Sequence, residues 1–193
     1  MSYKTYTTEA IVCGSRVNNT SDKSFLLFTK DAGMLWAAAK SVREERSRQR
    51  FALQDFSLIR ASLIKGKSGW RIGSVESDRN YFTGEGDSDS ARKARATATG
   101  ILRLARQFLH GEVGHPQIFD DIKQALMLSK EATSEDNQRI FDIFTLRFLH
   151  QLGYIANDPA FTDYLTSEQW YELPPLPTKA VDMIDRAKEA SHL

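Results

Sequence analysis

The stretch FSLIRASLIKGKSGWRIGSV, residues 56–75, decides the fold of this chain. Its first part, residues 56–65, places side chains alternately on two faces, which is the period of a β-strand. The sequence GKSG at 66–69 has the composition of a hairpin connection, and residues 70–75 return as the next strand. This part of the chain therefore predicts an antiparallel hairpin.

Upstream of the hairpin lie three more short runs of apolar or β-branched residues, separated by turns. They cover Thr8–Val17, Ser24–Lys30 and Met34–Lys40. Five short strands within roughly 75 residues are typical of a small barrel or sandwich. We expect a β-domain over residues 1–80, and a stretch without periodicity at 81–90 reads as a linker.

After residue 90 the apolar period changes from two to 3.6, which predicts helices. A first helix carries an apolar stripe and ends before Gly111, and a second runs from Pro116 to about Lys130. A third follows the capping residues 133–136 and is apolar on nearly all sides, so we expect it at the centre of a bundle. With a last helix at Thr178–Ala190, the chain is predicted to be α+β, with a helical domain at 91–193.

The composition excludes several classes of protein. The chain has 193 residues, of which 41% are hydrophobic and 26% charged, as in a soluble globular protein. A single Cys excludes an intrachain disulfide and a cysteine-rich zinc site. No apolar run reaches the ~18–20 residues of a membrane span, and residues 1–5 lack the apolar stretch of a signal peptide, so a cytoplasmic location is expected.

The sequence offers little support for an enzyme. GKS at 66–68 resembles the end of a phosphate-binding loop, but the Gly required five residues earlier is Ala61. The four histidines lack metal-ligand spacing, and Cys13 lies in a predicted strand as a small apolar residue. No arrangement of Ser, His and Asp stands out. We therefore expect no catalytic residues, no cofactor and no metal.

Charge is distributed unevenly along the chain. Residues 1–80 hold 14 Lys and Arg against 8 Asp and Glu, a net charge of +6, whereas residues 81–193 hold 12 against 17, a net of −5. A basic module joined to an acidic one suggests that the basic module faces a polyanion. Chance clustering is the alternative interpretation.

The basic charge is concentrated in the connection between the third and fourth predicted strands. The sequence KSVREERSRQR at 40–50 holds five cations in eleven residues, although Glu44 and Glu45 dilute them. Arginines bind phosphates through two parallel hydrogen bonds, so this loop is a candidate nucleic-acid contact. The candidate DNA-binding residues in and around it are Lys40, Arg43, Arg46, Arg48 and Arg50, with Lys65, Lys67 and Arg71 at the next hairpin.

Two tryptophans could stack on bases. Trp70 begins the fifth strand and is kept as a candidate, whereas the apolar run around Trp36 favours a core position for that residue. On the first helix, arginines recur opposite the apolar stripe. They form either a solvated face or an extension of the candidate DNA-binding surface of the barrel. They are Arg92, Arg95, Arg103 and Arg106.

Several pieces of the sequence, in their order and spacing, then point to a known family. They are EAIV at 9–12 with Arg16, FT at 28–29 with Gly33, AK at 39–40 before LQDF at 53–56, and 144–149 before LGY at 152–154. Together they resemble the RecO family of bacterial recombination mediators. Ser41 stands where the family usually has Gly, and no cysteines follow the LGY turn, where many members hold zinc.

The resemblance implies an oligonucleotide-binding (OB) barrel followed by a helical domain. It implies a nucleoid-associated, non-enzymatic protein that binds single- and double-stranded DNA, anneals strands, and works with RecR and single-stranded DNA-binding protein in loading RecA. By this resemblance, the DNA-contacting loop consists of Lys40, Arg43, Arg46, Arg48 and Arg50. Two alternatives remain open: an interaction adaptor of the same fold that binds DNA weakly or not at all, and an RNA-binding OB protein.

Overall fold

The computed structural model describes residues 5–82, 86–133 and 135–190. The chain divides into two compact units. The first comprises residues up to Gly84 together with Leu102–Phe119, and the second comprises Glu85–Ile101 together with Asp120–Leu193. The predicted linker at 81–90 falls partly on residues 83–85, and the predicted capping segment includes Ser134; these four residues lie outside the described part.

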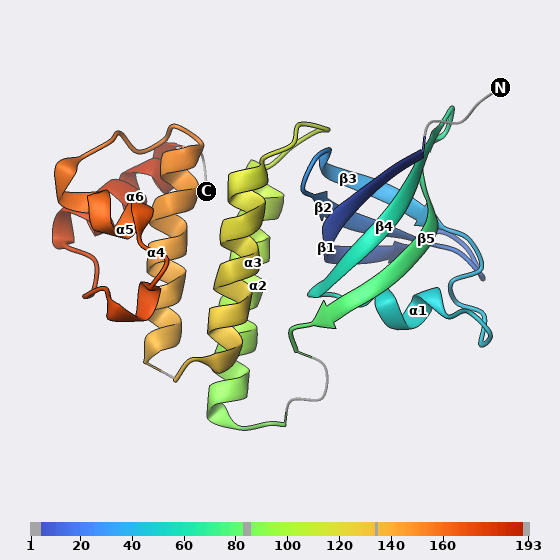
Figure 1. Cartoon of the computed structure of the whole chain (residues 1–193), viewed down its shortest axis with the longest axis horizontal. Helices are drawn as coiled ribbons and strands as arrows, with labels where there is room; N and C mark the ends of the chain where they lie inside the picture. The colour runs from blue at the N-terminus through green and yellow to red at the C-terminus, as the bar shows by residue number, and fades with distance from the viewer. Residues whose placement is uncertain (1–4, 83–85, 134, 191–193) are drawn as a thin grey trace. The chain divides into compact units, whose positions relative to one another are not determined.

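The first unit is built on a closed five-stranded barrel with the order β1-β2-β3-β5-β4 (Figure 1). β1 pairs with both β2 and β4, and the short parallel pairing of β3 with β5 closes the barrel. This order is that of an OB-type barrel, so the α+β prediction with an N-terminal OB barrel is confirmed. The strands are β1 (Thr5–Val17), β2 (Lys23–Thr29), β3 (Gly33–Ala39), β4 (Ser57–Gly66) and β5 (Gly69–Asn80).

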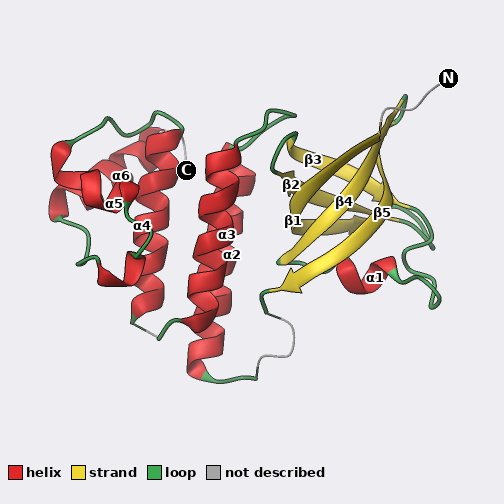
Figure 2. Cartoon of the chain, in the orientation of Figure 1, coloured by secondary structure: helices red, strands yellow, loops and turns green. Residues whose placement is uncertain are grey.

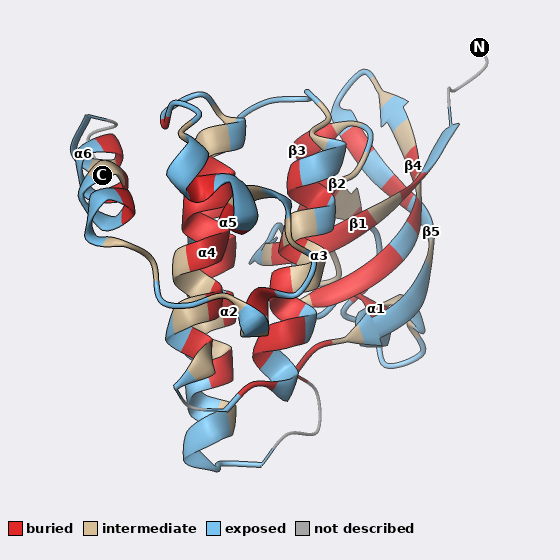
Figure 3. Cartoon of the chain, turned by 60° about the vertical axis from the view of Figure 1, so that its left-hand side comes forward, coloured by how far each residue is buried: buried red, intermediate tan, exposed pale blue. Residues whose placement is uncertain are grey.

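The barrel interior is filled by side chains that alternate along every strand, and the most buried stretches of the strands are red in Figure 3. In β4 the inward face is the one formed by Ile59, Ala61 and Leu63, which are at most 1% exposed. Trp70 of β5 belongs to the same core. Side chains at neighbouring positions in these strands therefore point outward.

The connection from β3 to β4 contains a four-residue helix, α1 (Gln49–Ala52). Val42, Ala52 and Leu53 are buried and fasten this connection to the barrel. Gln49 adds a hydrogen bond from its side-chain amide to the carbonyl of Gly73 in β5. The charged residues between these anchors are held on the surface of the barrel.

The segment Leu102–Phe119 packs on the outside of the barrel as part of the same unit. The backbone N–H of Met34 donates to the carbonyl of Gly111, and the rings of Phe28 and Phe119 lie 5.7 Å apart. Gly33 has a φ of +72°, and a Cβ there would lie 2.2 Å from the carbonyl oxygen of Val113. This close approach brings the loop that carries Glu112 against the barrel.

After the barrel, the described residues form helices as their only regular structure (Figure 2). α4 lies within the second unit, with every residue from Ile143 to Leu149 buried, and it packs against α5, α6 and the turn η2. The buried guanidinium of Arg147 pairs with Asp121 and donates to the carbonyls of Leu165 and Ser167. The elements are α2 (Asp89–Phe108), α3 (Pro116–Glu131), α4 (Asp136–Gln151), η1 (Pro159–Phe161), α5 (Thr162–Thr166), η2 (Trp170–Glu172) and α6 (Thr178–Ala190).

Two kinds of feature are absent from the described residues. No helix in the described ranges combines the length and the apolar character that crossing a bilayer requires. Nor do these ranges hold a group of three or more His, Cys, Asp or Glu side chains placed to bind a metal ion. Burial raises the pKa of the Cys13 thiol to about 12, so this side chain stays neutral.

Candidate nucleic-acid interface

The basic loop, residues 40–50, runs from the end of β3 into the start of α1 and presents its cations to solvent. All five predicted contact residues in it are exposed. They lie on one connection of the barrel, in the order Lys40, Arg43, Arg46, Arg48 and Arg50. The structure thus places the cations on a single surface segment, where phosphates can approach them.

Most of these cations have no carboxylate partner. Arg46 pairs with Glu44 at 3.0 Å from Nε to Oε2, but the Arg43 side chain donates, among the described residues, only to the carbonyl oxygen of Asn19, at 2.9 Å. The guanidinium of Arg50 lies 4.7 Å from the ring centroid of Phe51. The guanidinium of Arg48 has no hydrogen bond or ion pair with any described residue. The glutamates of the loop therefore neutralise one arginine and leave the other charges available.

Backbone contacts hold the basic loop against the turn between β1 and β2. Ser41 has a φ of +51°, in the left-handed region that favours glycine. Its N–H donates to Oδ1 of Asp22 at 2.7 Å, and the N–H of Arg43 donates to the carbonyl of Ser21 at 3.1 Å. The Ser41 N–H and the Asn19 side chain lower the pKa of Asp22, so this anchor is charged at neutral pH.

Glu44 is held at the base of the loop in its charged form. A hydrogen bond from the Ser41 side chain, followed by one from Arg46, lowers the pKa of Glu44. Because the Arg46 side chain is exposed, its pairing with Glu44 competes with water and salt. A phosphate can therefore compete for Arg46 as well.

The β4–β5 hairpin, residues 65–71, differs from the basic loop because a distant carboxylate occupies part of it. Nζ of Lys65 pairs with Glu112, whose other oxygen accepts a hydrogen bond from Nε1 of Trp70 at 2.8 Å. The bond from Lys65 and the bond from Trp70 lower the pKa of Glu112. Lys67 and Arg71 are exposed and make no ion pair with a described residue.

The two tryptophans of the barrel differ in exposure. Trp70 is 9% exposed, and its ring contacts Tyr6 and lies 5.1 Å from Nζ of Lys65. The expectation that Trp36 belongs to the core is wrong, because 37% of it is exposed. Trp36 lies on the outer face of β3, where the inward alternation of its neighbours Leu35 and Ala37 directs it to solvent.

The arginines of α2 divide into two groups. Arg92 lies 3.6 Å from Asp89 and Arg95 lies 3.3 Å from Asp87, so these two charges are matched locally. Arg103 and Arg106 belong to the barrel unit and form no ion pair with a described residue. Of these four arginines of α2, only Arg103 and Arg106 therefore offer a phosphate a charge that no described carboxylate compensates.

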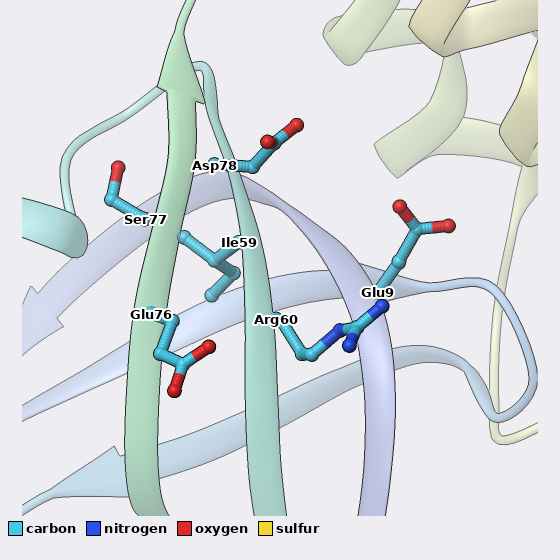
Figure 4. Close-up of a pocket in the computed structure, with 6 residues that line it drawn as sticks. All are labelled: Glu9, Ile59, Arg60, Glu76, Ser77 and Asp78. Carbon is cyan, nitrogen blue, oxygen red and sulfur yellow. The ribbon is translucent and has the colours of Figure 1, made fainter.

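The barrel also carries a pocket of about 240 Å³ on β1, β4 and β5. Figure 4 shows the carboxylates of Glu9, Glu76 and Asp78 around it, with Arg60 as its one basic side chain. Three carboxylates repel a phosphate, so this pocket does not extend the cationic surface. Sequence reasoning did not single it out.

Comparisons with known proteins agree with the barrel architecture. A family model described as "Recombination protein O N terminal" matches residues 1–78. A "DNA repair protein RecO" of Desulfitobacterium hafniense is 32% identical over 149 residues, which is 77% of this chain and 52% of the relative. One of Caldanaerobacter subterraneus subsp. tengcongensis is 28% identical over 148 residues, 77% of this chain and 58% of the relative. The chain thus spans somewhat more than half the length of these relatives, and the resemblance inferred from its sequence is confirmed.

Proposed function

We propose that the chain acts in DNA repair and recombination by binding DNA, because its residues 1–78 match the model of the recombination protein O family and its relatives are DNA repair proteins. The basic loop is the contact that the geometry supports best. Four of its five cations form no ion pair with a carboxylate of the described residues, and this observation carries the proposal. Lys67 and Arg71 of the neighbouring hairpin add two further contacts.

The mechanism is electrostatic. Each arginine that contacts a phosphate releases about one condensed counterion, so binding gains entropy and weakens steeply with salt. Because these contacts are made to the backbone, the loop accepts both single- and double-stranded DNA. Two strands held on one cationic surface repel each other less, and complementary strands can then pair. Annealing on this model needs no bond-breaking chemistry, so the role is non-enzymatic.

The resemblance to this family also motivates a proposal about partners. We infer that the chain works beside RecR and single-stranded DNA-binding protein and helps to load RecA. The relatives are longer than this chain, so these partnerships are tested on the chain itself. Pull-down of each purified partner by the purified chain is the direct measurement.

The test is strand annealing and single-stranded DNA binding by the wild type and by a loop variant in which Arg43, Arg46, Arg48 and Arg50 are replaced by Gln. If all four contact phosphate, the slope of log affinity against log salt falls by about 3, at about 0.7 per contact. A control variant loses four exposed cations elsewhere, namely Arg92, Lys93, Lys179 and Arg186. Equal binding by the loop variant and the wild type would reject the loop. Competition between matched DNA and RNA strands decides between those two ligands.

A second candidate function is a protein-interaction adaptor with weak DNA binding. The pairing of Arg46 with Glu44 and of Lys65 with Glu112 favours it, because both pairs remove cations from the surface. On this reading the wild type binds a partner but shows negligible DNA affinity at about 0.15 M salt, where the Debye length is about 8 Å. The salt series described above separates the two functions.

A further inference from the structure

The outer face of β1, β2 and β3 carries an exposed tryptophan among small side chains. The strand register aligns Trp36 with Leu26 and Leu26 with Gly14, and it aligns Ala38 with Ser24. Residues paired across strands share a face, so the indole of Trp36 has Ser24, Ala38 and Gly14 as its small neighbours. It is 37% exposed, whereas Trp70 and Trp170 are buried.

Arginines from three different elements converge on this face. The register pairs Arg16 of β1 with Ser24, and Ala38 with Arg71 of β5. Nη1 of Arg106 in α2 lies 3.7 Å from the position that a Cβ of Gly14 would occupy, so its side chain reaches over β1. None of the three arginines forms an ion pair with another residue of the described ranges. The charge on this face is therefore uncompensated.

The closest of these contacts joins a cation to the exposed ring. The guanidinium carbon of Arg16 lies 4.3 Å from the centroid of the Trp36 ring. An exposed guanidinium binds such a ring more weakly than a stacked nucleobase does. A base can therefore take its place on the ring, and the planar guanidinium keeps its donors for a phosphate.

We propose that Trp36 is a stacking platform for an unpaired base of single-stranded DNA, with Arg16, Arg71 and Arg106 binding the flanking phosphates. This inference rests on the proposed DNA-binding function and adds a strand preference to it. The bases of a duplex already stack on one another, so they offer no free face to the indole, whereas a single strand does. The basic loop accepts any backbone, and the Trp36 platform selects unpaired strands.

The experiment compares two labelled strands of equal length, an oligothymidine and an abasic strand with the same number of phosphates. Fluorescence anisotropy gives the affinity of each strand for the wild type, Trp36→Ala, Trp36→Phe and Tyr154→Ala. Tyr154 is an exposed aromatic residue of the second unit and serves as the matched control. Because the Trp36 side chain is exposed, its truncation leaves the barrel core intact, which thermal unfolding checks.

The Trp36→Ala variant is expected to bind oligothymidine at least about 5-fold more weakly than the wild type, with unchanged binding of the abasic strand. Trp36→Phe keeps most of the affinity, and Tyr154→Ala binds as the wild type does. An equal loss of affinity for both strands, or no loss for either, in Trp36→Ala would contradict the role of Trp36 as a stacking platform. DNA binding by the wild type would still support the proposed function. If the wild type binds neither strand, the proposed function itself fails.

Discussion

The basic loop at 40–50 and the β4–β5 hairpin at 65–71 are both cationic connections of one barrel, but they differ in how their charges are matched. The glutamates of the basic loop lie beside its arginines in sequence, yet only Glu44 engages one of them. The hairpin has no acidic residue of its own, and Glu112 nevertheless occupies both Lys65 and the polar edge of Trp70. The number of charges in a segment therefore does not determine how many of them a ligand can reach.

The difference arises from what each segment packs against. The basic loop meets the β1–β2 turn mainly through backbone groups, and of its arginines Arg43 alone donates to that turn, so most of its guanidinium groups stay in solvent. The hairpin meets the loop between α2 and α3, which is fixed on the barrel by the close approach of Gly33 to Val113. Changes at the contact between the hairpin and the α2–α3 loop should make the cations of the hairpin as accessible as those of the basic loop. Changes within the basic loop should increase the difference in accessible charge between the two segments.

The largest effect is expected from Gly33→Ala. The Cβ of an alanine at this position would lie 2.2 Å from the carbonyl oxygen of Val113. The alanine backbone would also have to adopt a φ of +72°. Strain and overpacking together should lower the free energy of unfolding by about 2–5 kcal/mol. Urea denaturation measures this loss. Gly66→Ala is the matched control, because the nearest atom to a Cβ there is 3.7 Å away; equal losses at both positions would contradict the packing of the loop on the barrel.

The next largest effect is expected from Glu112→Gln, which removes the charge that pairs with Lys65. If Lys65 then contacts a phosphate, single-stranded DNA affinity should rise about 4-fold at 0.15 M salt, and the salt slope should steepen by about 0.7. Anisotropy titrations over a salt series give both quantities. Glu131→Gln changes the net charge equally at an exposed residue of α3 and should leave the slope unchanged. An unaltered slope in Glu112→Gln would show that Lys65 does not reach DNA.

A smaller effect is expected within the basic loop when Glu44→Gln is compared with Glu45→Gln. Both variants change the net charge by one, but only the first releases Arg46 from an ion pair. Exposed pairs of this kind are worth at most about 1 kcal/mol, so the gain in DNA affinity should stay below about 5-fold. The ratio of the two dissociation constants isolates the pair. A ratio of one would mean that Arg46 is equally available with and without Glu44.

Local patterns in the sequence were sufficient to predict much of the fold. Alternation in β4 predicted a strand with two faces, but not that the face of Ile59, Ala61 and Leu63 is the inner one, and the 3.6-residue period located the helices. Contacts between distant segments left no such pattern: Glu112 is 47 residues from Lys65 and lies in a loop of ordinary composition. Trp36 was misplaced because an apolar run looks the same whichever face of a strand is covered.

The smallest effect is a pH dependence of the contact that distinguishes the hairpin. Hydrogen bonds from Lys65 and Trp70 lower the pKa of Glu112 from its usual value of 4.5 in the folded state. A lowered carboxyl pKa contributes stability that is present above the unfolded value and is lost as the pH falls through the folded one. Below pH 4.5 the wild type should therefore lose stability more steeply than Glu112→Gln, which has no carboxyl to protonate there. Urea midpoints measured from pH 6 to pH 3 give this difference, and because both partners are largely exposed, water and salt keep it small. Parallel curves for the two proteins would mean that Glu112 does not hold the hairpin in solution, and the contrast with the basic loop would then reduce to the count of cations.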